Sequence, residues 1–118
     1  MFFPTIFSVE VNETVTLKFP IVNKFNRNVV NPKTGQSEEQ IFRICNGNNT
    51  KNCGFWIDRK FGKKSLSGAT YYNQTEKTLV IKNFLRTDEG VYVSGNGKRG
   101  YCVNIAGGTG GCKTGFGG

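Results

Sequence analysis

The residues of this chain that could carry chemistry are four cysteines and eight scattered acids, and they form no catalytic pattern. The 118-residue sequence contains no histidine, so neither a Ser/His/Asp nor a Cys/His nucleophile can be assembled. The cysteines form no CxxC motif, and a Cys/His zinc site is excluded by the absent histidine. No two acids are placed as a general acid and base. We therefore expect a protein that is not an enzyme and that binds no metal and no cofactor.

The cysteine count indicates an oxidising compartment, and three glycosylation sequons are consistent with it. Four cysteines in a short chain are most simply used as two disulfides, which persist outside the cytosol. Sequons begin at Asn12, Asn48 and Asn73, although composition alone gives about two. Residues 1–11 have neither the basic start nor the apolar run of a signal peptide or membrane span. We expect a secreted protein, or one on the extracellular face of the cell surface, with no membrane span in this chain.

The elements that must position these residues are short β-strands. No segment keeps helical spacing for more than about two turns, whereas period-2 alternation recurs along the chain. Strands are predicted over residues 7–11, 15–19, 41–45, 54–60, 70–72, 78–82, 90–94 and 101–105. Residues 20–40, rich in Asn, Lys and Gly, are predicted to form a long loop or a loop holding a short strand. Residues 1–106 form one predicted domain, followed by a Gly-rich tail over 107–118 that Cys112 pins.

One spaced motif carries most of the information about the fold, namely Leu79-x-Ile81-x-x-Phe84-x-x-x-Asp88-x-Gly90-x-Tyr92. Its first two residues alternate inward on a strand, and its phenylalanine plugs the turn that follows. Tyr92 is predicted to fold its hydroxyl back onto upstream backbone as a tyrosine corner. Asp88 is predicted to accept hydrogen bonds from the turn and to pair with a basic residue such as Arg59 or Lys60.

This motif resembles the E strand, E–F turn and F strand of variable-type immunoglobulin domains, and the resemblance covers residues 7–105. It implies an all-β fold, an immunoglobulin-like two-sheet antiparallel sandwich with Greek-key connections. The family joins strands B and F by a disulfide, but Phe19 and Ser94 stand at those positions, so Phe19 is expected to fill the space. The tryptophan of strand C is also missing where Ile44 stands, and Trp56 is expected to repack from the next strand.

The disulfide pairing is predicted from this strand assignment. Cys45 and Cys53 flank a hairpin similar to the disulfide-bonded C–C′ hairpin of polymeric immunoglobulin receptor domains, although any two neighbouring cysteines in a secreted loop would also pair. Cys102 lies on the last strand, which is not adjacent to C or C′ in this fold. Of the three pairings, we therefore expect Cys45 with Cys53 and Cys102 with Cys112, each closing a loop of about ten residues.

The alternation assigns a binding face. With Tyr92 directed inward, Val91 and Val93 face outward, and Ile41 and Arg43 face outward on the predicted neighbouring strand. Apolar residues on this face are how variable-type domains pair with each other or with a partner. Burial under the tail or the long loop is the alternative. We expect an extracellular recognition or adhesion module that binds a protein partner, or itself as a homodimer, through this G-F-C-C′ face.

The net charge of +8 supports a second hypothesis. In a variable-type domain the C′ region and the F–G turn flank one sheet, so six basic residues could form a cationic ridge: Arg59, Lys60, Lys63, Lys64, Lys98 and Arg99. The protein would then be a secreted basic effector that binds anionic glycan or lipid. A solvated basic face that aids solubility is the simpler interpretation. Nucleic acid is not expected, because aromatic residues are not interleaved with these bases for stacking.

Overall fold

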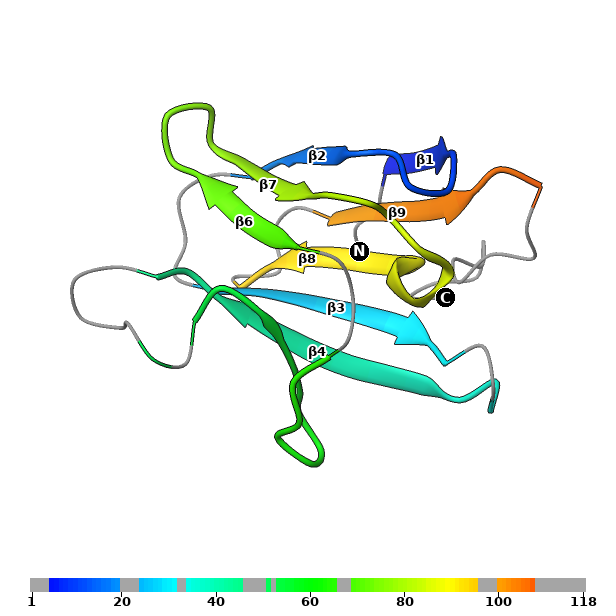
Figure 1. Cartoon of the computed structure of the whole chain (residues 1–118), viewed down its shortest axis with the longest axis horizontal. Coiled ribbons are helices and arrows are strands. Elements are labelled where there is room, and N and C mark those ends of the chain that lie inside the picture. Colours follow the sequence, from blue (N-terminus) through cyan, green and yellow to red (C-terminus); the bar gives the residue numbers. More distant parts are fainter. Residues whose placement is uncertain are drawn as a thin grey trace.

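The computed structural model describes residues 5–19, 24–31, 34–45, 51, 53–65, 69–95 and 100–107. Its elements are β1 (Thr5–Val9), β2 (Val15–Lys18), β3 (Lys24–Val30), β4 (Ser37–Arg43), β5 (Trp56–Asp58), β6 (Thr70–Asn73), β7 (Thr78–Ile81), the 3-10 helix η1 (Arg86–Asp88), β8 (Gly90–Ser94) and β9 (Gly100–Ile105). The strands form two layers, a six-stranded sheet in the order β1-β9-β8-β3-β4-β5 and a three-stranded sheet in the order β2-β7-β6 (Figure 1). The predicted all-β, two-sheet sandwich is therefore confirmed.

Alternation of apolar residues explains how the layers pack. The inward side chains of both sheets form one core, which includes Val15, Leu17, Phe25, Phe42, Leu79, Ile81 and Val103. Phe19 is fully buried, with ring centroids 5.0 Å from Phe25 and 5.1 Å from Tyr101. Trp56 is also buried and packs against Phe42 and Tyr92. Aromatic packing thus occupies the centre of the sandwich, as predicted for Phe19 and Trp56.

Three predicted hairpins are present. Strands β4 and β5 pair through Phe42 and Trp56, β6 pairs with β7, and β8 pairs with β9, all antiparallel. One pair departs from the antiparallel expectation, because β1 runs parallel to β9 at the edge of the larger sheet. The first strand also ends at Val9, and Val11, which was predicted to belong to this strand, lies in the following turn and is 52% exposed.

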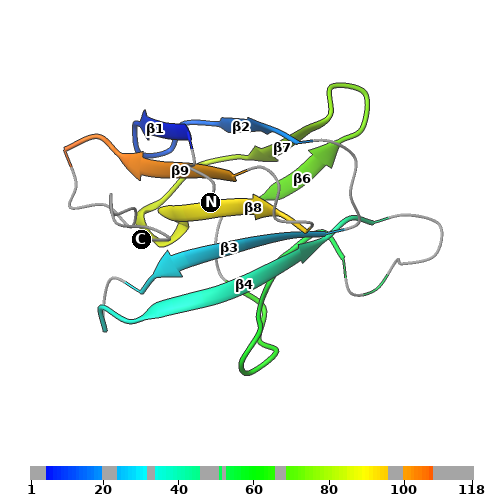
Figure 2. The same cartoon turned by 180° about the vertical axis from the view of Figure 1, so that it is seen from behind.

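The predicted long loop over residues 20–40 is wrong. This segment contains all of β3 and the first part of β4, which pair antiparallel from Lys24–Arg43 to Val30–Ser37. Strand β3 lies between β4 and β8, so the segment beginning at Ile41, predicted to neighbour β8, is one strand further away (Figure 2). Ile44, where the resemblance put the missing tryptophan, follows β4 and does not lie on a strand. The inward residues of β3 are Phe25, Arg27 and Val29, and the central arginine hid the apolar alternation.

Candidate functional site

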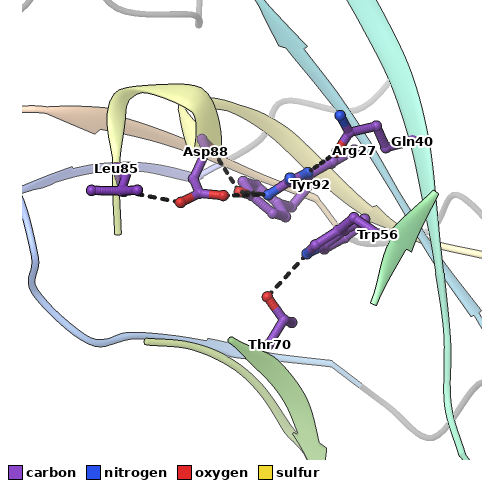
Figure 3. A network of polar contacts seen from close by, with 7 residues as sticks. All are labelled: Arg27, Gln40, Trp56, Thr70, Leu85, Asp88 and Tyr92. Carbon is purple, nitrogen blue, oxygen red and sulfur yellow. Dashed lines mark hydrogen bonds and ion pairs between the residues drawn. The ribbon is translucent and has the colours of Figure 1, made fainter. Parts of the chain in front are cut away.

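A buried polar network holds the larger sheet in place, and Arg27 on β3 is its centre (Figure 3). The Arg27 side chain donates from Nη1 to Asp88 Oδ1 at 2.8 Å and to the Tyr92 hydroxyl at 2.9 Å. Its Nε donates to Gln40 Oε1 at 2.7 Å on β4. The guanidinium lies 4.3 Å from the centre of the Trp56 ring. Since a buried charge is tolerated only when paired and hydrogen-bonded, this network explains a fully buried arginine in a sandwich core.

The tyrosine corner is confirmed, and Asp88 has a basic partner as predicted, but this partner is neither of the two residues named for it. The Tyr92 hydroxyl donates to the Asp88 carbonyl oxygen, as the motif predicted. Asp88 pairs with Arg27, whereas Arg59 pairs with Glu39 and the Lys60 ammonium lies over the Phe61 ring. Burial raises the pKa of the Tyr92 hydroxyl, while the nearby Arg27 charge opposes that shift.

The same network and the contacts around it hold the strands of the larger sheet on their inner side. Asp88 Oδ2 accepts from the Leu85 backbone N–H at 2.9 Å, which closes the turn before β8. Gly90 follows this turn, and a Cβ there would lie 2.0 Å from the Asn28 carbonyl oxygen, so only glycine allows β8 to approach β3. Trp56 Nε1 donates to Thr70 Oγ1 at 3.0 Å and links the two layers. Because β3, β4, β5 and β8 are all anchored on their inner side, their outer side is a rigid surface.

The outer side of the six-stranded sheet carries one row of side chains across four strands. Ile57 on β5 is opposite Ile41 on β4, Ile41 is opposite Asn26 on β3, and Asn26 is opposite Val93 on β8. All four are partly exposed. We call this set, Ile57, Ile41, Asn26 and Val93, the outer row. Three apolar side chains therefore flank one amide at the middle of the sheet.

The predicted binding residues occupy this side in different ways. Ile41 and Val93 face outward as predicted, but β3 separates them by about 10 Å. Arg43 is exposed at the end of β4. Val91 also has the outward register, yet it is only 5% exposed, so its predicted presentation to solvent is wrong. Its register partner on β9 is Cys102, which is 3% exposed.

Two outer-row residues were missed by the sequence analysis. Asn26 lies on the strand that was predicted to be loop, and Ile57 lies on a strand whose facing was not assigned. The Asn26 Oδ1 atom is buried and forms no hydrogen bond within the described part of the chain. The available signal was the alternation of Phe25 and Val29, which places Asn26 on the opposite side.

Four of the six basic residues of the predicted ridge are grouped at one turn. Arg59, Lys60, Lys63 and Lys64 are all exposed and follow β5 directly. Lys98 and Arg99 lie outside the described residues. Beside this turn, a groove of about 640 Å³ lies between the β3–β4 turn and residues 58–61, and the 2.7 Å Arg59–Glu39 ion pair contributes to its lining.

Some of the cysteines and sequon asparagines lie in the described part of the chain and others lie outside it. Cys45 and Cys53 are bonded, as predicted. Cys102 is also disulfide-bonded, and its predicted partner Cys112 lies outside the described residues. Asn12 is exposed in the β1–β2 turn, Asn73 is half-buried and accepts from the Glu76 N–H, and Asn48 lies outside the described residues.

The described residues contain no cluster of three or more His, Cys, Asp or Glu side chains that could hold a metal ion. They also contain no helix with the length and apolar character needed to cross a membrane. A scan of the chain against protein-family models gave no match, and searches of curated proteins and of solved structures gave none either.

Proposed function

We propose that this chain is a variable-type immunoglobulin-like module that works outside the cytosol and binds a protein partner, or a second copy of itself, through the outer row. The strand order supports the family assignment, since variable-type domains place two additional strands beside a G-F-C sheet that faces a smaller sheet. The tyrosine corner of Tyr92 adds to that support, and the Cys45–Cys53 disulfide supports a compartment outside the cytosol. A binding role fits a chain without histidine whose buried Asp88 carboxylate is occupied by Arg27.

The outer row is the observation that carries this proposal. Its three apolar side chains are partly exposed on a surface held rigid from behind, and apolar groups surrounding a polar centre are typical of interface cores. The buried Asn26 Oδ1 leaves one acceptor that could pair with a partner's donor after a small side-chain rotation. Rigid surfaces lose little conformational entropy on association.

Charge substitutions in the outer row test the proposal. Ile41→Glu and Val93→Glu should each abolish self-association without changing the fold, because a carboxylate desolvated opposite apolar groups is uncompensated. Sedimentation or light scattering reports the oligomeric state, and circular dichroism reports the fold. Thr16→Glu, an exposed position on β2 of the other sheet, is the matched control and should leave the assembly unchanged. Val91→Glu is unsuitable because Val91 is buried.

One result would exclude self-pairing, and another would exclude the outer row. A wild type that is monomeric at high concentration would exclude self-pairing and leave only a different protein as partner. A dimer that survives both glutamate variants would exclude this surface as the interface.

A second candidate function is the binding of anionic glycan or lipid by a secreted basic effector through the cationic ridge. It is favoured by four exposed basic residues within six positions of the turn after β5. Its salt dependence is distinctive, because binding between exposed charges weakens steeply as ionic strength rises, whereas binding through the outer row should not. The double variant Lys63→Glu/Lys64→Glu should lose heparin retention and keep any outer-row dimer.

A further inference from the structure

The turn after β5 has a defined shape. Both Asp58 carboxylate oxygens accept backbone N–H groups from the turn, that of Lys60 at 3.0 Å and that of Phe61 at 3.2 Å. The Gly62 N–H donates to the Asp58 carbonyl at 2.8 Å, and the Asp58 N–H donates to the Lys63 carbonyl at 2.8 Å. Gly62 has a φ of 70°, which glycine adopts without strain. We call residues 59–64 the basic tip, and it projects from the sandwich beside β4 (Figures 1 and 2).

The basic tip combines the most exposed large apolar side chain among the described residues with positive charge. Phe61 is 69% exposed, although the free energy of a phenyl ring is lower in an apolar environment than in water. The Lys60 ammonium lies 5.3 Å from the centre of the Phe61 ring, and the Lys64 ammonium lies 4.7 Å from the centre of the Phe55 ring. Arg59 has Glu39 as its partner, whereas Lys60, Lys63 and Lys64 form no ion pair within the described residues. The core does not need this arrangement, because neither the ring nor the three ammonium groups are buried.

We propose that the basic tip docks on an anionic lipid surface, with the Phe61 ring entering the boundary between headgroups and acyl chains and Lys60, Lys63 and Lys64 contacting acidic headgroups. Membrane-surface segments combine these two elements, an apolar group that partitions into the interface and bases that bind anionic lipid. A sulfated glycan would use the lysines and leave Phe61 in water, so the exposed ring favours the lipid. This inference narrows the second candidate function and is independent of the outer row.

Co-sedimentation of the full chain with vesicles tests the proposal. We expect binding to vesicles of phosphatidylcholine and phosphatidylserine, and none to phosphatidylcholine alone, because the bases need acidic headgroups. Phe61→Ala should weaken binding about tenfold, the expected loss for one partly inserted aromatic side chain. Lys63→Glu/Lys64→Glu should weaken it by about thirtyfold or more, since each base contributes about fivefold.

The chain offers a matched control on the opposite sheet. Tyr71 on β6 is 44% exposed and lies 5.7 Å from the Lys82 ammonium, so it reproduces an exposed aromatic beside a lysine without the surrounding bases. Tyr71→Ala should leave vesicle binding unchanged. Phe61→Trp should retain binding and shift its fluorescence emission to shorter wavelength on insertion, against a constant background from buried Trp56.

The outcomes separate the two hypotheses for the ridge. Heparin binding without vesicle binding, or vesicle binding that Phe61→Ala leaves intact, would overturn lipid docking while the cationic ridge stands. Binding to neither heparin nor vesicles would overturn both lipid docking and the cationic ridge. The outer row would still be tested separately by the dimer assay. Equal losses in Tyr71→Ala and Phe61→Ala would show that the aromatic contribution is not specific to the basic tip and would also overturn the proposal.

Discussion

Arg27 places a positive charge in the middle of an otherwise aromatic and aliphatic core. Neither it nor Asp88 has an exposed side chain, so each depends on the other for compensation. Gln40 and Tyr92 occupy two further N–H groups of the guanidinium, which orients it as well as neutralising it. The pair therefore fixes β3 relative to η1 and β8.

Removal of only the cation should be costly. Arg27→Met should lower the free energy of unfolding by about 3 to 5 kcal/mol, because the Asp88 carboxylate is left buried without a compensating positive charge. The measurement is equilibrium unfolding in urea. The double variant Arg27→Met/Asp88→Asn removes both charges and keeps an acceptor for the Leu85 N–H, so it should lose less than the single variant. If the double variant were as unstable as the single, the ion pair would not explain the loss.

Tyr92 gives a second prediction for a single side chain. Tyr92→Phe should cost about 1 to 3 kcal/mol in free energy of unfolding, because the buried Asp88 carbonyl loses its donor. Tyr71→Phe removes a hydroxyl from a side chain that is 44% exposed and should have little effect.

The pH dependence of the Tyr92 effect follows from its raised pKa. Above the ordinary tyrosine value of 10.0, the unfolded chain releases the proton and the folded chain retains it. The unfolded state then binds fewer protons, so stability falls with rising pH by up to about 1.4 kcal/mol per unit. Phe lacks this proton, so the stability difference between wild type and Tyr92→Phe should narrow above pH 10 in urea titrations. A difference that stays constant with pH would mean that Tyr92 titrates alike in both states.

The strands differ in how far along the sequence their pairing partners lie. The β4–β5 hairpin is closed by the Cys45–Cys53 disulfide and by pairing of Phe42 with Trp56, and both features come from residues close in sequence. Strand β9 instead has a local partner, β8, on one edge and a distant one, β1, on the other. Its Cys102 faces outward and is disulfide-bonded.

Non-reducing peptide mapping tests the bond made by Cys102. We expect a peptide in which Cys102 is joined to Cys112, because Cys45 and Cys53 are bonded to each other. Mass spectrometry before and after reduction identifies the linked fragments, and the Cys45–Cys53 peptide serves as the internal control. A fragment joining Cys102 to Cys45 would contradict the pairing in the sandwich.

Across the entire sandwich, the two proposed binding surfaces use different physical forces. The outer row crosses β5, β4, β3 and β8 of the six-stranded sheet and relies on apolar contact, whereas the basic tip follows the edge strand β5 and relies on charge and insertion of Phe61. Substitutions in one should leave the other intact, because sites that share no partner behave additively. The excess of 16 basic over 8 acidic residues attracts any anionic surface and does not select between orientations.

The all-β class, three hairpins, the Tyr92 corner and the Cys45–Cys53 bond could all be predicted from the order of the amino acids. Each depends on period-2 alternation or on residues within a few positions, which adjacent chain segments specify. Only the tertiary structure showed that Arg27 is buried, because its compensating Asp88 is 61 residues away. The same distant pairing inserted β3 between β4 and β8, which separated Ile41 from Val93 and brought Asn26 between them. The burial of Val91 could not be predicted from the sequence either, because alternation gives the side that a residue faces and not what covers that side.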